Sequence, residues 1–143
     1  MSILQRIVVP VVTPEDAQET CEAVQPHLDE VGTVIAVHVI EKAGGAIDKA
    51  PLAKREEDAE EILGVVEDRL RDKVAVDTRV VYDTDVVDGI FEAAEDADAT
   101  SVVFVSREGG RLIRLLSGDT ATRIVSEATI PVVALPDGEG EDE

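Results

Sequence analysis

The stretch ATSVVFVSREGGRLIRLLSGDTATRIVSEATIPVVALP, residues 99–136, decides the fold of this chain. Its pattern predicts a buried strand, a loop that contains Gly109, Gly110 and Gly118, a helix and a second apolar strand. A strand that leads through such a loop to a helix N-terminus is where an α/β domain holds a phosphate group. We therefore expect the rest of the chain to supply a sheet that presents this loop.

The same alternation of strands and helices continues through the whole chain. Short β-branched apolar runs predict strands, and apolar residues at helical spacing behind capping residues predict helices. Strands are expected at residues 3–12, 33–40, 74–82, 100–106 and 130–135, and helices between residues 13 and 32, at 53–71, between 85 and 99, and at 119–128. This order predicts an α/β fold, a five-stranded parallel sheet with helices on both faces in a Rossmann-like three-layer sandwich.

Capping residues and apolar spacing describe the helices in more detail. Thr13 is the expected N-cap of the first helix, with Pro14 at its first position. Asp83 and Asp85 fit a cap for the third helix better than a catalytic acid pair, and the acidic run at residues 56–58 is expected to be solvated surface. Buried helix positions are expected at Ala17, Cys21, Val24, Leu28, Ala59, Ile62, Leu63, Val66, Leu70, Val87, Ile90, Phe91, Ala94, Ala121, Ile124, Val125 and Ala128.

The predicted sheet has one expected ligand crevice and two expected edges. Ligands of open parallel sheets bind beyond the carboxyl ends of the strands, where the strand order reverses. That rule places Val12 and Thr13 across one crevice from the loop at residues 106–118. The strand at 74–82 alternates apolar and polar residues, which predicts an edge with one wet face. The strand at 130–135 is the other edge, and because it carries no charge it needs a cover.

The acidic composition excludes two classes of partner. The chain has 32 acidic side chains against 13 basic ones, a net charge of −19, which repels nucleic-acid backbones and anionic membranes. Phe91, Phe104 and Tyr82 are its only aromatic residues, too few for a platform on which bases stack. No apolar run approaches the length of a membrane span. We therefore expect no nucleic-acid partner, no membrane partner and a cytoplasmic location.

Residues 1–136 are expected to form one domain, and residues 137–143 a disordered acidic tail. The tail accounts for −5 of the net charge, which leaves −14 on the domain. A folded body this acidic repels itself at low ionic strength, so the composition favours a halophilic source with concentrated, screening cytoplasmic salt. An ordinary acidic cytosolic protein is the alternative.

Candidates for catalysis or metal binding are few. The single Cys21 lies on the apolar side of the first helix and is interpreted as a core thiol. His38 falls in a buried strand and His27 on a helix, without further ligands at metal-binding spacing, so no metal site is expected. No arrangement of nucleophile and base stands out. We expect no enzyme, with slow ATP hydrolysis left open.

Several short segments carry a family resemblance. They are RIVVPV at residues 6–11, VHV at 37–39, LLSG at 115–118, RIV at 123–125 and IPVV at 130–133. Through them, and through the order of its elements, the chain resembles the universal stress protein family over residues 2–136. The resemblance implies an adenine nucleotide alpha hydrolase-like fold. It also implies a homodimer in which the last strand pairs with its symmetry mate through Ile130, Pro131, Val132, Val133, Ala134 and Leu135.

The resemblance also implies a nucleotide site, and this chain departs from its glycine pattern. ATP-binding members carry a glycine, two residues, a second glycine, nine residues, and a glycine followed by Ser or Thr. Counted back from Gly118, the first two glycines fall on Val105 and Glu108. A one-residue deletion moves them to Ser106 and Gly109. Neither alignment reproduces the whole pattern, so the ATP-binding motif is degenerate.

Two further positions differ from ATP-binding members. Asp119 stands where the family places a hydroxyl against phosphate, and Val12 stands where it has an aspartate that contacts the adenosine. A carboxylate at position 119 opposes the charge of a phosphate. Together these departures predict that ATP binding is weakened or lost. The candidate nucleotide site consists of Val12, Thr13, Val39, Ser106, Arg107, Gly109, Gly110, Gly118, Asp119 and Thr120.

Two functions remain open from the sequence. The leading hypothesis is a stress-response or regulatory binding module that acts through dimerisation or a protein partner, without ATP turnover. The alternative is an adenine-nucleotide-binding module with a rearranged loop, because Arg107, Arg111, Arg114 and Arg123 gather around it in an otherwise negative chain. These arginines could equally pair with neighbouring carboxylates on the surface.

Overall fold

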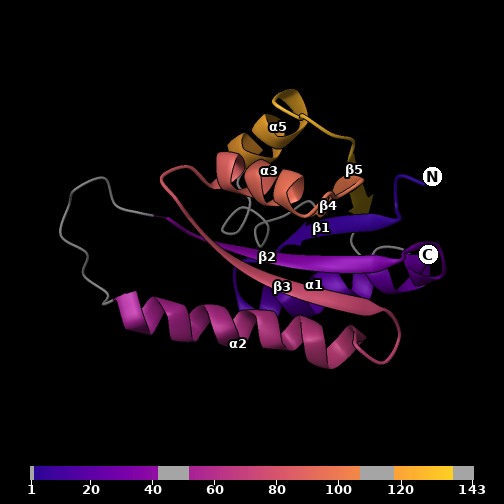
Figure 1. The fold of residues 1–143 in the computed structure, drawn as a ribbon, viewed down its shortest axis with the longest axis horizontal. Helices are drawn as coiled ribbons and strands as arrows, with labels where there is room; N and C mark the ends of the chain where they lie inside the picture. Colours follow the sequence, from indigo (N-terminus) through magenta and orange to yellow (C-terminus); the bar gives the residue numbers. More distant parts are fainter. Residues whose placement is uncertain (1, 42–51, 107–117, 137–143) are drawn as a thin grey trace.

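The computed structural model describes residues 2–41, 52–106 and 118–136, which form the expected five-stranded parallel sheet with helices on both faces (Figure 1). Its strands are β1 (Arg6–Pro10), β2 (Thr33–Glu41), β3 (Ala75–Asp83), β4 (Ser101–Ser106) and β5 (Val132–Pro136). Residues 42–51, the glycine loop at 107–117 and the tail at 137–143 lie outside the described residues.

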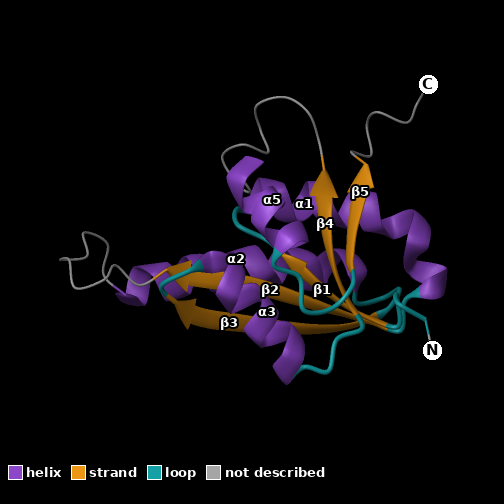
Figure 2. Ribbon diagram, turned by 90° about the horizontal axis from the view of Figure 1, so that it is seen from above, coloured by secondary structure: helices purple, strands orange, loops and turns teal. Residues whose placement is uncertain are grey.

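The helices form two layers around the sheet (Figures 1 and 2). The helices α1 (Pro14–Val24) and α2 (Leu52–Leu70) cover one face, and α3 (Val86–Asp96) and α5 (Gly118–Ser126) cover the other. Two apolar clusters fill the spaces between these layers, one around Val9 and Val66 and one around Val8 and Ile90. The central strands are therefore buried on both faces, which explains their uniformly apolar sequences.

The strand order is β3-β2-β1-β4-β5, and every pairing is parallel. The order reverses between β1 and β4, as the sequence predicts for the ligand crevice. Strands β3 and β5 are the two edges, again as expected. The first strand is shorter than the predicted 3–12, because the residues before it form a turn in which the Gln5 N–H donates to the Ser2 carbonyl at 3.1 Å.

The first two helices follow their sequence signals closely. Thr13 caps α1, since its Oγ1 accepts a hydrogen bond from the Asp16 N–H at 3.0 Å. The α-helix ends at Val24, earlier than expected, and the 3₁₀-helix Gln25–Glu30 follows. Pro26 explains this end, because proline has no N–H and its ring clashes with the carbonyl four residues earlier. All five expected positions of α2 are buried, namely Ala59, Ile62, Leu63, Val66 and Leu70.

The last helix and strand differ from expectation. Ile124 is buried, but Val125 is 60% exposed and Ala128 is exposed, so both predictions of burial were wrong. The reason is that α5 covers the sheet with one side only, and Val125 lies about 100° around the helix from Ile124. Strand β5 begins at Val132, so Ile130 and Pro131 precede it.

Candidate functional site

A cleft of about 520 Å³ opens at the carboxyl ends of β1 and β2. The strand ends and the loop after β1 form its floor, and α2 and α3 supply its walls. Its lining consists of Pro10, Val11, Val12, Thr13, Pro14, Val37, His38, Val39, Ile40, Glu41, Arg55, Asp58, Glu61, Ile62, Val86 and Ile90. The cleft lies beside the point where the strand order reverses, where parallel sheets bind their ligands.

The floor of the cleft is fixed by hydrogen bonds to neighbouring elements. The Val11 N–H donates to the Val37 carbonyl at 3.0 Å, and the Val11 carbonyl lies 2.9 Å from Nδ1 of His38. Because a carbonyl can only accept, Nδ1 carries the proton in this contact. The Val12 N–H donates to Oδ2 of Asp16 at 2.9 Å. The helix dipole of α1 stabilises this carboxylate, because Asp16 lies in the first turn of the helix. The floor is therefore preformed, and the Val12 amide is already occupied.

The α2 side makes the cleft acidic. Arg55, Asp58 and Glu61 of α2 line it together with Glu41 at the end of β2. The Arg55 guanidinium donates to the Glu41 carbonyl at 2.6 Å, and Oδ1 of Asp58 lies 3.2 Å from Nζ of Lys54. The lining thus holds three carboxylates and one guanidinium. An anionic ligand group meets net repulsion on this side.

Sequence reasoning missed this wall. The run at residues 56–58 was expected to be plain solvated surface, but Asp58 lines the cleft. Glu56 accepts a hydrogen bond from Oη of Tyr82 at 2.5 Å, which raises the pKa of the tyrosine. The three-residue spacing of Arg55 and Asp58 indicates only that the two residues share a helix face. Which element that face meets depends on the packing of α2 beside β2, which no local pattern reports.

The structure brings part of the sequence-predicted site together. Val12, Thr13 and Val39 all line the cleft. Ser106 ends β4, and Gly118, Asp119 and Thr120 begin α5. The positions of Arg107, Gly109 and Gly110 lie outside the described residues.

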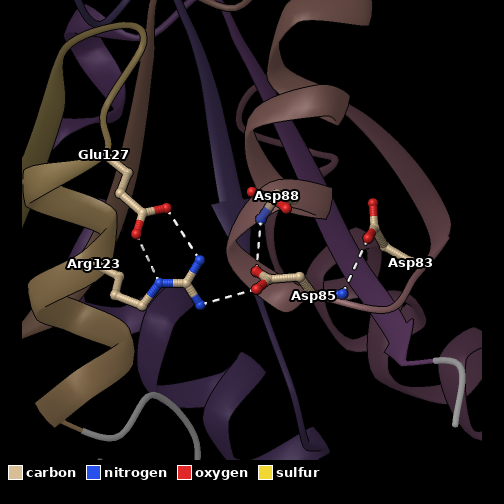
Figure 3. Close-up of polar contacts among 5 residues, drawn as sticks. All are labelled: Asp83, Asp85, Asp88, Arg123 and Glu127. Carbon is tan, nitrogen blue, oxygen red and sulfur yellow. Dashed lines mark hydrogen bonds and ion pairs between the residues drawn. The ribbon is translucent and has the colours of Figure 1, made fainter. Parts of the chain in front are cut away.

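A group of charged side chains joins the start of α3 to α5 (Figure 3). Asp85 is the N-cap of α3, as predicted, and its Oδ1 accepts a hydrogen bond from the Asp88 N–H at 3.1 Å. Its Oδ2 accepts one from Nη1 of Arg123 at 3.0 Å. Arg123 also donates through Nε and Nη2 to both carboxylate oxygens of Glu127, at 2.8 and 3.0 Å. For Arg123, the sequence alternative of surface pairing with carboxylates is confirmed.

These contacts shift the ionisation of all three groups. The Asp88 amide and then Arg123 lower the pKa of Asp85, Arg123 lowers the pKa of Glu127, and Glu127 and Asp85 raise the pKa of Arg123. Both carboxyls have a lower pKa in the folded chain than in the unfolded one. Their stabilising contribution is therefore present above the unfolded pKa and is lost as the pH falls through the folded value.

Cys21 is a buried thiol in the core beneath α1. Burial raises its pKa to about 11, so the unreactive protonated form persists at mildly alkaline pH. We predict that iodoacetamide leaves Cys21 unmodified in the folded protein and alkylates it after unfolding, as read by mass spectrometry. Labelling of the folded protein at the unfolded rate would contradict this and show that α1 opens.

Two features are absent from the part of the chain that the structure describes. Within residues 2–41, 52–106 and 118–136, no three His, Cys, Asp or Glu side chains are grouped so that they could hold a metal ion. In the same part of the chain, no helix combines the length and the hydropathy that crossing a membrane requires.

Two sequence comparisons had different outcomes. A family model described as "Universal stress protein family" matches residues 4–136, which span all five strands. A search of curated proteins found no match.

Solved structures share the fold. One is a protein from the universal stress protein family of Burkholderia pseudomallei, with 23% identity and a TM-score of 0.67 over 95% of this chain and 98% of that one. Another is the universal stress protein of Archaeoglobus fulgidus in complex with dAMP, with 20% identity and a TM-score of 0.62 over 94% and 99%. A third, from Arabidopsis thaliana with AMP bound, has 16% identity and a TM-score of 0.62 over 97% and 95%. At these identities the likeness is one of fold.

Proposed function

Because the chain belongs to the universal stress protein family, we propose that it is a regulatory binding module of the stress response whose cleft takes the adenosine part of an adenine nucleotide. The observation that carries this proposal is the open cleft of about 520 Å³ at the ends of β1 and β2. Its mainly apolar lining suits a base and a sugar. The dAMP and AMP complexes of two proteins with this fold support the ligand class.

We expect the additional phosphates of ATP to add no affinity over AMP in this cleft. Each added phosphate brings negative charge near a lining with three carboxylates and one guanidinium. The sequence adds a carboxylate, Asp119, where ATP-binding relatives have a hydroxyl. The degenerate motif and the carboxylates that line the α2 side of the cleft therefore both weaken ATP binding, and we expect no ATP turnover.

Calorimetry with AMP and ATP tests this function. We predict that AMP binds with a sub-millimolar Kd. ATP should bind with a Kd above about 1 mM, which corresponds to a binding free energy of less than about 4 kcal/mol. Glu61→Gln should strengthen ATP binding at low salt by about twofold to fivefold, because it removes one repulsive charge from the lining. Glu60→Gln is the matched control, since Glu60 is exposed on the same helix but does not line the cleft.

Two outcomes would overturn parts of the proposal. If AMP does not bind, the cleft is not a nucleotide site, and the alternative of a module that acts only through dimerisation or a protein partner takes its place. If ATP binds at low micromolar concentration, the triphosphate site is intact. Arg107→Glu should then abolish ATP binding, because the arginines of the 107–117 loop must hold the phosphates.

We also propose that the protein acts as a homodimer through β5. In the described part of the sheet, β5 pairs only with β4, so its outer edge is available for a second copy. Its residues Val132, Val133, Ala134 and Leu135 carry no charge that would deter such pairing. Antiparallel pairing about a two-fold axis would satisfy the outer backbone groups of both copies.

A further inference from the structure

The contact between Asp85, Arg123 and Glu127, called here the α3–α5 bridge, joins two helices that are far apart in the sequence. Glu127, which directly follows the end of α5, holds the guanidinium of Arg123 by two hydrogen bonds. These two hydrogen bonds orient the guanidinium so that Nη1 reaches across the gap to Asp85, 38 residues earlier (Figure 3). The bridge is only partly solvent-exposed, with side-chain exposures of 40% for Arg123 and 31% for Asp85.

The bridge acts on the part of α3 that forms a cleft wall. Asp85 is the N-cap, and the next residue, Val86, lines the cleft together with Ile90 one turn later. This part of α3 lies very close to the floor, because a Cβ placed on Gly89 would come within 3.2 Å of both methyl groups of Val39. A small movement of the first turn of α3 would therefore change the shape of the cleft.

The charges around the bridge make Arg123 hard to replace. Asp83, Asp85, Asp88 and Glu127 place four carboxylates in this group, and Arg123 is the one cation among the residues drawn in Figure 3. Asp83 is tied into the same turn, since its Oδ1 accepts a hydrogen bond from the Asp85 N–H at 3.0 Å. Without the guanidinium, Asp85 and Glu127 would repel each other across the gap between the helices.

We propose that Arg123 is a positioning residue for the cleft: through Asp85 it holds the first turn of α3 against the floor and so sets the affinity for the adenosine part of the ligand. This inference rests on the proposed function and adds a residue that lies outside the cleft lining. Arg123 acts through Asp85 and contacts no ligand itself. The proposal also gives a role to one of the four arginines that gather around the glycine loop in the sequence, because Arg123 pairs within the protein instead of binding phosphate.

Four variants and one control test the bridge by AMP titration of the full chain. Arg123→Gln should weaken AMP binding by about tenfold, and Asp85→Asn by a similar factor, because asparagine keeps the cap and loses the charge. The double variant should bind no more weakly than either single one. Arg123→Lys should recover part of the affinity. The control is Arg79→Gln, which breaks a comparable pair with Asp77 at 3.2 Å on β3 and should leave binding unchanged.

Hydrogen exchange without ligand separates this inference from the proposed function. In Arg123→Gln, the amides of residues 86–90 should exchange faster than in the wild type, and in Arg79→Gln they should not. If the wild type fails to bind AMP but this exchange pattern holds, the nucleotide function is wrong and the positioning of α3 stands. Unchanged exchange at residues 86–90, or faster exchange with unaltered AMP affinity, would overturn the role of Arg123. Asp85→Asn supplies the same readout if Arg123→Gln does not fold.

Discussion

Molar KCl should raise the melting temperature of this protein by more than about 10 °C over its value at low ionic strength. For a chain of this size, that shift corresponds to an increase of about 3 kcal/mol in the free energy of unfolding. The physical reason is a net charge of −19 on 143 residues. Like charges crowd the surface of α2 in particular, at Glu57, Glu60, Glu61, Glu67 and Asp68, all of which are exposed. Salt at molar concentration shortens the screening length to about 3 Å, which removes most of this repulsion.

Calorimetric melting across a KCl series is the measurement, and two controls separate charge screening from other effects. An uncharged osmolyte at matched osmotic strength should give a much smaller rise, because it does not screen charge. Deleting residues 137–143 should change the melting temperature little, since we expect that tail to make no packed contact. A flat salt profile would reject salt adaptation and favour the alternative of an ordinary acidic cytosolic protein.

A lysine in β5 should convert the proposed homodimer to a monomer. Val132→Lys or Val133→Lys places a charge in the apolar edge, but both valines are half-buried and also pack on the core clusters. Ala134→Lys is the cleaner variant, because Ala134 is exposed and its replacement leaves the core intact. Two charges brought together across the two-fold axis repel each other and resist desolvation. We therefore expect the dissociation constant of the dimer to rise by at least about tenfold.

Light scattering in molar KCl is the appropriate test of the dimer, because salt screens the repulsion between two acidic copies. The matched control is Ala75→Lys, an exposed alanine at the opposite edge of the sheet, which should leave the assembly unchanged. A wild-type monomer at tens of micromolar in high salt would remove the dimer from the proposal. The nucleotide cleft would be unaffected by that result, since it belongs to one chain.

The order and type of the elements, and most of the core, follow from the sequence alone. Local signals were sufficient, because strand runs, the Thr13 and Asp85 caps and the apolar spacing of α2 are read within a few residues of one another. The two sheet edges also followed from the alternating pattern of β3 and from the position of the last strand. Part of the candidate site followed in the same way, since Val12, Thr13 and Val39 stand at strand ends.

Only the tertiary structure decided which side chains meet across the ends of the sheet. Asp58 and Glu61 join the cleft because α2 packs beside the end of β2, and no local pattern reports that packing. Arg123 meets Asp85 because α3 and α5 cover the same face, although 38 residues separate them. Val125 is exposed because α5 presents one side to the sheet, a matter of helix placement and not of residue type. Periodicity determines which residues share a face, whereas the packing of distant elements determines what that face touches.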